Sequence, residues 1–221
     1  MTNQLVTVFE DLIGFGDSDK PPSFCYRMRE QASVLKKVME HLGVERFHVI
    51  AHSMGGIVGI ELAEMMPQRI RSLINLEGNL TIEDCTISKQ VAEMSEEYFA
   101  QEGFENLRNS IAEESKKAGN ESLRDYLKSL AKATPQSLHK SAISTVRESS
   151  RGDLFTRFDK LPFYKCYIYG EKNKGVFPVE KMLKQKGIPL FYVSKSGHSM
   201  RKENPKEFDE LVLKIITSLD A

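Results

Sequence analysis

The chain has 221 residues, of which 40% are hydrophobic and 28% are charged, a balance that excludes an intrinsically disordered chain. Its 31 basic and 31 acidic residues give a net charge of zero, so no general attraction to nucleic acid or to a membrane surface is expected. The sequence shows neither a secretory signal nor a continuous apolar run of about 18 residues, and we expect a soluble protein of the cytoplasm.

Five short apolar or β-branched runs predict five β-strands. In chain order they are residues 5–9, 47–51, Ile70–Leu76, 164–169 and 189–193. Apolar residues recur at helical spacing over residues 27–42 and stop at Gly43, and a second helix follows Ser53 and ends at Pro67. Strands that alternate with helices predict an α/β fold with a mainly parallel sheet covered on both faces.

Signals for a final helix follow the fifth strand. Asn204 can cap this helix, Pro205 suits its first position, and Glu207 can complete a capping box. An apolar stripe then begins at Phe208, which predicts one face packed against the sheet.

Residues 80–158 form a long, charged stretch without strand signals, and they include helical patterns at residues 96–114 and 122–133. We therefore expect residues 1–79 and 159–221 to form the core domain and residues 80–158 to form a helical lid over a site at the strand ends.

The segment FHVIAHSMGG, residues 47–56, is the sharpest chemical signal. Its strand ends at a serine and a helix begins at once, which is the setting of a nucleophile elbow. Such a tight turn strains the backbone of Ser53 and requires small residues two positions before and after it. Ala51 and Gly55 meet this requirement in an A-x-S-x-G pattern.

Three segments, DLIGFGDSDKPP (11–22), AHSMGG (51–56) and SGHSMRKENPKEF (196–208), resemble the α/β-hydrolase family in their order and spacing. The resemblance extends over almost all of the chain. It implies the α/β-hydrolase fold, with a mainly parallel sheet flanked by helices and a helical lid insertion, and the chemistry of a serine hydrolase.

A serine hydroxyl needs an imidazole to accept its proton and a carboxylate to orient and stabilise the imidazolium. His198 is the candidate base because it lies in a glycine-containing loop after a strand. We interpret the other histidines, His41, His48, His52 and His139, as structural or surface residues.

The catalytic acid is less directly indicated. The commonest family pattern places Asp after the strand at residues 164–169, but Asn173 falls there, and an amide cannot stabilise an imidazolium as a carboxylate does. A minority of the family takes its acid from the end of the strand after the elbow helix, where this chain has Glu77. We favour Glu77, with Glu171, Asp84 or no acid as alternatives, and expect Asp11 to hold its own loop together.

In the family, two backbone N–H groups stabilise the tetrahedral oxyanion. One should belong to Met54, and the other comes from an HG-containing loop before the strand that here covers residues 5–9. That loop and the first three strands of the family have no counterpart in the sequence. We therefore expect an N-terminally truncated fold, and a homo-oligomer if an exposed strand edge is shared.

The sequence predicts a hydrolase that cleaves a carboxylic ester or thioester of a small apolar substrate through an acyl-enzyme on Ser53. Lactone and C–C bond hydrolysis stay open, and the alternative is a non-catalytic binding or interaction protein of the same fold. No cofactor or metal is expected, because Cys25, Cys85 and Cys166 are widely spaced and read as reduced thiols. The string GFGDSD, residues 14–19, also does not open a helix as a phosphate-binding loop would.

Overall fold

The computed structural model describes residues 6–119 and 121–220. Within these residues one four-stranded sheet is present, with its strands in the order β1-β2-β3-β4. The strands are β1 (Phe47–His52), β2 (Ile70–Leu76), β3 (Tyr164–Gly170) and β4 (Leu190–Val193). Each neighbouring pair runs parallel, so the predicted parallel sheet is confirmed.

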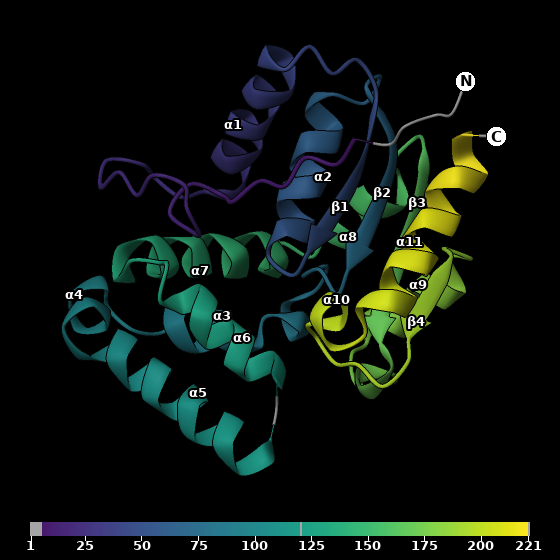
Figure 1. Cartoon of the computed structure of the whole chain (residues 1–221). Helices are drawn as coiled ribbons and strands as arrows, with labels where there is room; N and C mark the ends of the chain where they lie inside the picture. Colours follow the sequence, from purple (N-terminus) through teal and green to yellow (C-terminus); the bar gives the residue numbers. More distant parts are fainter. Residues whose placement is uncertain (1–5, 120, 221) are drawn as a thin grey trace.

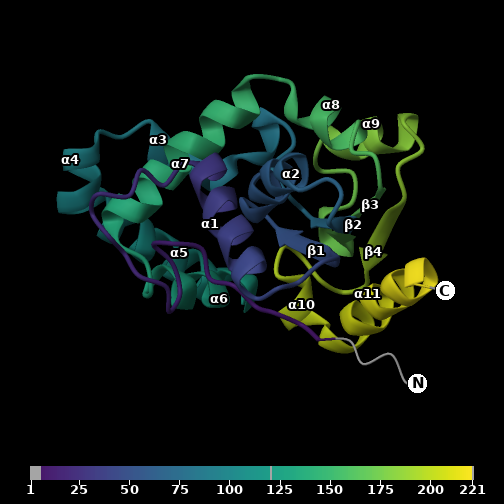
Figure 2. The same cartoon turned by 90° about the horizontal axis from the view of Figure 1, so that it is seen from above.

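Helices cover both faces of this sheet (Figure 2). On one face lie α1 (Met28–His41), α2 (Gly55–Met65), α8 (Leu154–Asp159) and α9 (Val179–Gln185), which share one apolar core with the sheet. On the other face, α10 (Met200–Glu203) and α11 (Pro205–Asp220) pack against β2, β3 and β4 around the buried Ile74 and Phe208. This covering of both faces explains why most residues of β2 and β3 are buried.

The described residues between β2 and β3 form helices joined by short connections and contain no strand, as the sequence predicts. This segment contains η1 (Ile82–Asp84), α3 (Thr86–Ala92), α4 (Glu96–Tyr98), the π-helix η2 (Phe99–Gly103), α5 (Phe104–Ala118), α6 (Glu121–Leu130), α7 (Pro135–Ser150) and α8, while η3 (Glu171–Asn173) follows β3. Buried Phe99, Ile111 and Leu130 belong to a separate apolar core in this segment. Figure 1 shows α3 to α7 beside the end of the sheet to which the strands point. No helix in the described part of the chain combines the length and apolarity that a membrane crossing needs.

The predicted strand at residues 5–9 is not formed: Leu5 lies outside the described residues, and residues 6–10 carry no strand pairing. Val6 and Phe9 are exposed, and the Phe9 ring lies under the Arg201 guanidinium at 4.5 Å. A run of β-branched residues becomes a strand only where another backbone accepts its hydrogen bonds. Among the described residues β1 pairs with β2 alone.

The start of α11 differs in detail from the predicted capping box. The Asn204 backbone N–H donates to Met200 O at 2.9 Å instead of to Glu207. The Glu207 carboxylate accepts a hydrogen bond from the Asn204 side chain at 2.7 Å and another from Ser194 N at 3.1 Å. Glu207 therefore connects the first turn of α11 to the loop after β4, which carries His198.

Candidate active site

The residues that the sequence selects for chemistry lie just after the ends of parallel strands. Ser53 follows β1, Glu77 follows β2, and His198 lies in the loop after β4. Because the carboxyl ends of parallel strands meet at one edge of the sheet, residues far apart in sequence are brought together there. Figure 1 shows the strands pointing toward the loops near α10.

Ser53 occupies a strained turn between β1 and α2. Its φ of 54° lies in the left-handed region that non-glycine residues rarely adopt. The Ser53 N–H donates to Leu76 O at 3.0 Å, and Ser53 O accepts from Gly56 N at 2.8 Å. The strand, turn and helix predicted around this serine are therefore present, with the turn fixed against the end of β2.

The glycine that this turn requires is Gly56 and not Gly55, contrary to our expectation. A Cβ on Gly55 would meet no atom within 4 Å in the rest of the described chain. A Cβ on Gly56 would lie 2.8 Å from the Gly78 Cα and 2.9 Å from the Asn75 Oδ1. The backbone after β2 is thus the neighbour that demands a small residue.

The closest acid–base contact in this region joins His198 to Glu77. The His198 Nδ1 lies 2.8 Å from the Glu77 Oε2. Gly170 N donates to the Glu77 Oε1 at 2.8 Å, and the Asn173 Nδ2 donates to the Glu77 Oε2 at 2.8 Å. Glu77 itself is buried, with a left-handed φ of 43°. A neutral His198 that donates from Nδ1 to this carboxylate keeps its Nε2 as a proton acceptor.

The alternative acids make other contacts. The Glu171 carboxylate accepts from the Lys195 backbone N–H at 3.0 Å on an exposed loop. The Asp84 carboxylate accepts from Thr81 N at 2.8 Å and Leu80 N at 3.0 Å, and burial raises the pKa of Asp84 to about 6. Neither carboxylate hydrogen-bonds to His198 within the described residues.

Asn173 is the residue that sequence reasoning passed over. It cannot replace a carboxylate, but its amide holds the same Glu77 oxygen that His198 contacts. Asn173 lies after β3, where the common family pattern has an acid. That position could have predicted a contact with Glu77, the acid that follows β2.

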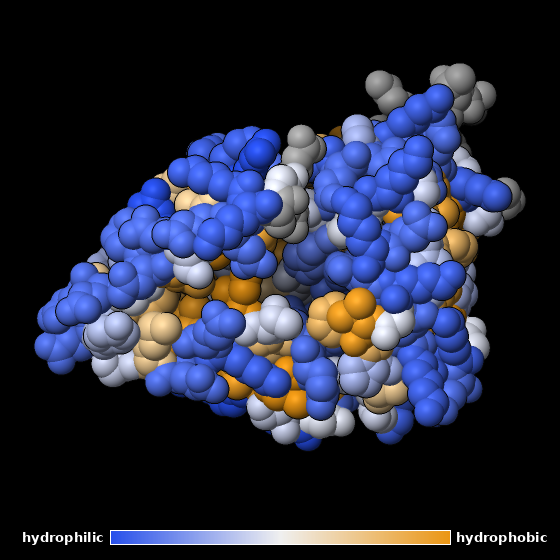
Figure 3. Space-filling model, turned by 90° about the horizontal axis from the view of Figure 1, so that it is seen from below, coloured by the Kyte–Doolittle hydropathy of each residue, from blue (hydrophilic) through white to orange (hydrophobic). Residues whose placement is uncertain are grey.

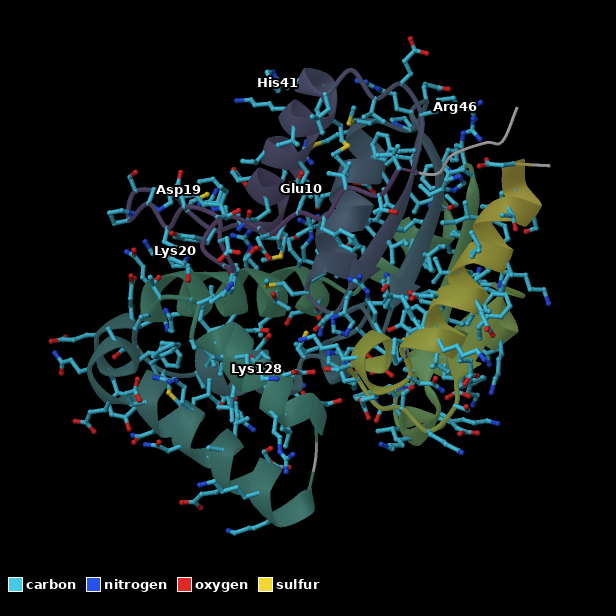
Figure 4. The ribbon with its side chains drawn as sticks, viewed as in Figure 1. Glu10, Asp19, Lys20, His41, Arg46 and Lys128 are labelled. Carbon is cyan, nitrogen blue, oxygen red and sulfur yellow. The ribbon has the colours of Figure 1, made fainter. Side chains whose placement is uncertain are left out.

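Of the remaining histidines, two make structural contacts and His41 is exposed. The His48 Nδ1 lies 2.8 Å from the Ser72 Oγ, and the His139 Nε2 lies 2.8 Å from Met94 O. Figure 4 labels His41 at the end of α1 that lies away from α10.

His52 is nearer to the chemistry than its sequence position suggested. Its Nε2 lies 2.8 Å from His198 O, and the two imidazole rings are 4.5 Å apart. Although part of the His52 side chain is open to solvent, desolvation of the ring, with the nearby His198, lowers the pKa of His52 to about 3. A neutral His52 donates to the His198 carbonyl without adding a positive charge beside the base.

Two groups at the elbow have no hydrogen-bond partner among residues 6–119 and 121–220: the Ser53 hydroxyl and the Met54 backbone N–H. Both are therefore free for an incoming molecule. Asp11 accepts from Asp17 N at 2.9 Å and lies within its own loop, as expected.

The chain was compared with known proteins. A family model described as alpha/beta hydrolase fold matches residues 7–192. The probable lysophospholipase BODYGUARD 5 of Arabidopsis thaliana is 42% identical over 64 residues, 28% of this chain and 14% of that protein. The fluoroacetate dehalogenase of a Burkholderia species is 37% identical over 81 residues, 35% of this chain and 27% of that protein. Each match thus spans less than a third of the relative's own length.

Among solved structures, a thermophilic esterase from Thermogutta terrifontis superposes with a TM-score of 0.75 at 20% identity. The alignment covers 96% of this chain and 79% of the esterase, and at that identity it supports the fold. The family model covers most of the sequence, and the fold observed here is the one that its description names. The chain belongs to the alpha/beta hydrolase fold family.

Proposed function

We propose that the chain is a serine hydrolase in which Ser53 is the nucleophile, His198 the general base and Glu77 the acid that orients the base. The observation that carries the proposal is the 2.8 Å contact between the His198 Nδ1 and the Glu77 Oε2, made at the sheet edge that also holds the strained Ser53 turn. This is the arrangement of roles that activates a serine in unrelated folds.

In the proposed reaction the Ser53 Oγ attacks the carbonyl carbon of an ester while its proton passes to the His198 Nε2. The negative charge that develops on the carbonyl oxygen is stabilised by the free Met54 N–H. The His198 imidazolium then protonates the leaving alcohol or thiol, and an acyl-enzyme remains on Ser53. Water, deprotonated by His198, then attacks the acyl carbonyl carbon. The bond from that carbon to the Ser53 Oγ breaks, the Oγ takes the proton back from His198, and the carboxylic acid is released.

The Glu77 environment supports this role. Its carboxylate accepts hydrogen bonds from Gly170 N and the Asn173 amide, and these bonds fix its position beside His198. A buried, ionised Glu77 favours the His198 tautomer with a proton on Nδ1 and stabilises the imidazolium that forms.

We assign the substrate class as a carboxylic ester or thioester with a small apolar acyl group. Figure 3 shows apolar side chains around a hollow on the face toward which the strands point. In this proposal residues 80–158 act as a lid over the core formed by residues 1–79 and 159–221. The esterase and probable lysophospholipase named among the comparisons are consistent with ester cleavage.

Dehalogenation fits less well, although one relative is named a fluoroacetate dehalogenase. If Ser53 displaced a halide from carbon, the product would be an ether. An ether has no carbonyl for water to attack, so the enzyme could not be regenerated. We expect no catalytic release of fluoride from fluoroacetate.

A fluorophosphonate probe tests the proposal directly. We expect rapid covalent labelling of the wild type at Ser53 and none for Ser53→Ala, with turnover of p-nitrophenyl esters highest for short acyl chains. Equal ester turnover by the two proteins would remove Ser53 from the mechanism. Absence of both labelling and turnover in the wild type would favour the non-catalytic binding protein.

A further inference from the structure

We propose that Ser122 and Glu203 are positioning residues for His198, so that helix α6 of the insertion helps to align the base. The inference rests on the proposed function of His198. It concerns groups that the reaction scheme does not use.

The peptide groups on both sides of His198 are held by this pair. Gly197 N donates to the Glu203 Oε1 at 3.0 Å, and Ser199 N donates to the Ser122 Oγ at 3.2 Å. The Ser122 hydroxyl donates in turn to the same Glu203 oxygen. Ser122 and Glu203 are therefore hydrogen-bonded to each other as well as to the loop that carries His198.

The Glu203 carboxylate is well placed to remain charged in this position. Its side chain is 8% exposed, and the Lys172 Nζ lies 3.0 Å from its second oxygen. Burial opposes ionisation, but hydrogen bonds from Ser122, Lys172 and Gly197 outweigh it and lower the pKa of Glu203. Hydrogen bonds to a charged acceptor are the stronger kind, so the loop is held firmly.

The His198 side chain depends on this backbone support. It is 46% exposed, and its ring is anchored through Nδ1 to Glu77. The position of the Nε2 therefore follows from the course of the loop through Gly197 and Ser199. A displacement of about 1 Å at a reacting group can lower a rate by about 100-fold.

Ser122 belongs to α6, which lies next to α10 in both views (Figures 1 and 2). The same helix makes a second contact there, between the Asp125 Oδ2 and the Lys202 Nζ at 3.6 Å. A displacement of α6 would break the bond from Ser199 N to the Ser122 Oγ and would remove the hydroxyl donor from Glu203. In this proposal the alignment of His198 therefore depends on the position of α6.

The test compares Ser122→Ala with Ser129→Ala. Ser129 lies on the same helix, and its hydroxyl donates to Asp125 O within that helix. We expect Ser122→Ala to lower kcat about tenfold, with KM within about twofold, because a misaligned base slows chemistry more than binding. We expect the exchange of the Ser199 amide with water to accelerate about tenfold, since one hydrogen bond is lost. Ser129→Ala should change neither quantity.

A second pair of variants separates positioning from folding. Glu203→Gln retains an oxygen for Gly197 and Ser122 and should keep most of kcat, whereas Glu203→Ala should lower kcat further and alter the pH profile of kcat/KM. Amide exchange and the NMR signal of the His198 Nδ1 proton need no turnover. They test the inference even if the chain proves to be no hydrolase. The inference would be overturned if Ser122→Ala and Ser129→Ala had the same exchange rate at the Ser199 amide or the same His198 Nδ1 signal. In an active enzyme, an unchanged kcat in Ser122→Ala would also overturn it.

Discussion

The two halves of the candidate site are built differently. Glu77 follows the inner strand β2 and His198 lies in the loop after β4, and Gly170, Asn173 and Glu203 make hydrogen bonds to Glu77 or to the His198 loop. Ser53 follows the edge strand β1, whose Ile50 is 42% exposed, and within the described residues its hydroxyl has no partner. The acid–base half is organised by many neighbours, while the nucleophile half depends on one strained turn.

This difference suggests how each half responds to mutation. A carboxylate with several donors is sensitive to the loss of its charge and less sensitive to the loss of one donor. In the turn after Ser53, the backbone at Gly56 approaches the backbone at Gly78 closely, so a larger side chain at Gly56 should destabilise the fold. The following predictions test the two halves in order of expected effect.

The largest effect should come from Glu77→Gln. An amide keeps the shape of the carboxylate but cannot stabilise the His198 imidazolium, so we expect kcat to fall by about 10⁴-fold. Glu171→Gln should stay within a few-fold of the wild type, because the Glu171 carboxylate is occupied by Lys195 N. Steady-state kinetics with a p-nitrophenyl ester measures both. A greater loss in Glu171→Gln would move the acid to Glu171.

Asn173→Ala should have an intermediate effect. It removes one of the two hydrogen bonds that the Glu77 Oε2 accepts from side chains, and leaves the charge and the contact with His198 in place. We expect kcat to fall about tenfold, the loss typical of one hydrogen bond to a charged group. Asn173→Asp is the sharper variant, because two adjacent carboxylates share a proton and the acid limb of the pH–rate profile should move to higher pH. An unchanged profile in Asn173→Asp would mean that Asn173 and Glu77 are apart in solution.

The nucleophile half is tested by stability. Gly56→Ala places a methyl group 2.8 Å from the Gly78 Cα, a backbone atom that cannot turn away, so we expect a loss of about 1–3 kcal/mol in the free energy of unfolding. Gly55→Ala is the matched control, since its methyl group would enter open space. It should be neutral or slightly stabilising, because alanine favours the helix by up to about 1 kcal/mol. Urea unfolding of both variants checks this, and equal losses would contradict the observed close approach.

Much of the architecture could be predicted because it depends on local patterns. The predicted bounds of β2, Ile70–Leu76, match those observed, since this mostly buried strand begins and ends at apolar residues that Arg69 and Glu77 flank. The turn at Ser53 was also predictable, because a strand and a helix adjoin it directly.

The failures share a different cause, which is dependence on a distant backbone. Residues 6–9 have strand-forming side chains, yet no neighbouring strand pairs with them in the described structure. The choice between Gly55 and Gly56 depends on Gly78, and the hydrogen bond from Ser199 N to Ser122 joins residues that no sequence spacing relates. Local patterns identify the candidate catalytic side chains, whereas the groups that hydrogen-bond to them or to their loops become visible only in three dimensions.

The smallest expected effect concerns Asp84, a second carboxylate beyond the end of β2. Burial raises the pKa of Asp84 from 3.8 to about 6, so the folded protein binds the proton more tightly than the unfolded chain does. The Asp84 contribution to stability is therefore largest below pH 4 and declines as the pH rises to 6. Asp84→Asn removes this pH dependence. Between pH 4 and pH 7 its free energy of unfolding should therefore rise by on the order of 1 kcal/mol relative to that of the wild type, after allowance for partial exposure.

Asp17→Asn is the control. A hydrogen bond from Lys132 lowers the pKa of the exposed Asp17, so the pH dependence of the Asp17 contribution to stability has the opposite sign. Its stability relative to the wild type should fall, if it changes at all, as the pH rises over the same range. Chemical unfolding at several pH values measures both differences. A flat difference for Asp84→Asn would mean that Asp84 is already ionised at low pH. Its bonds to the Leu80 and Thr81 N–H groups would then outweigh its burial.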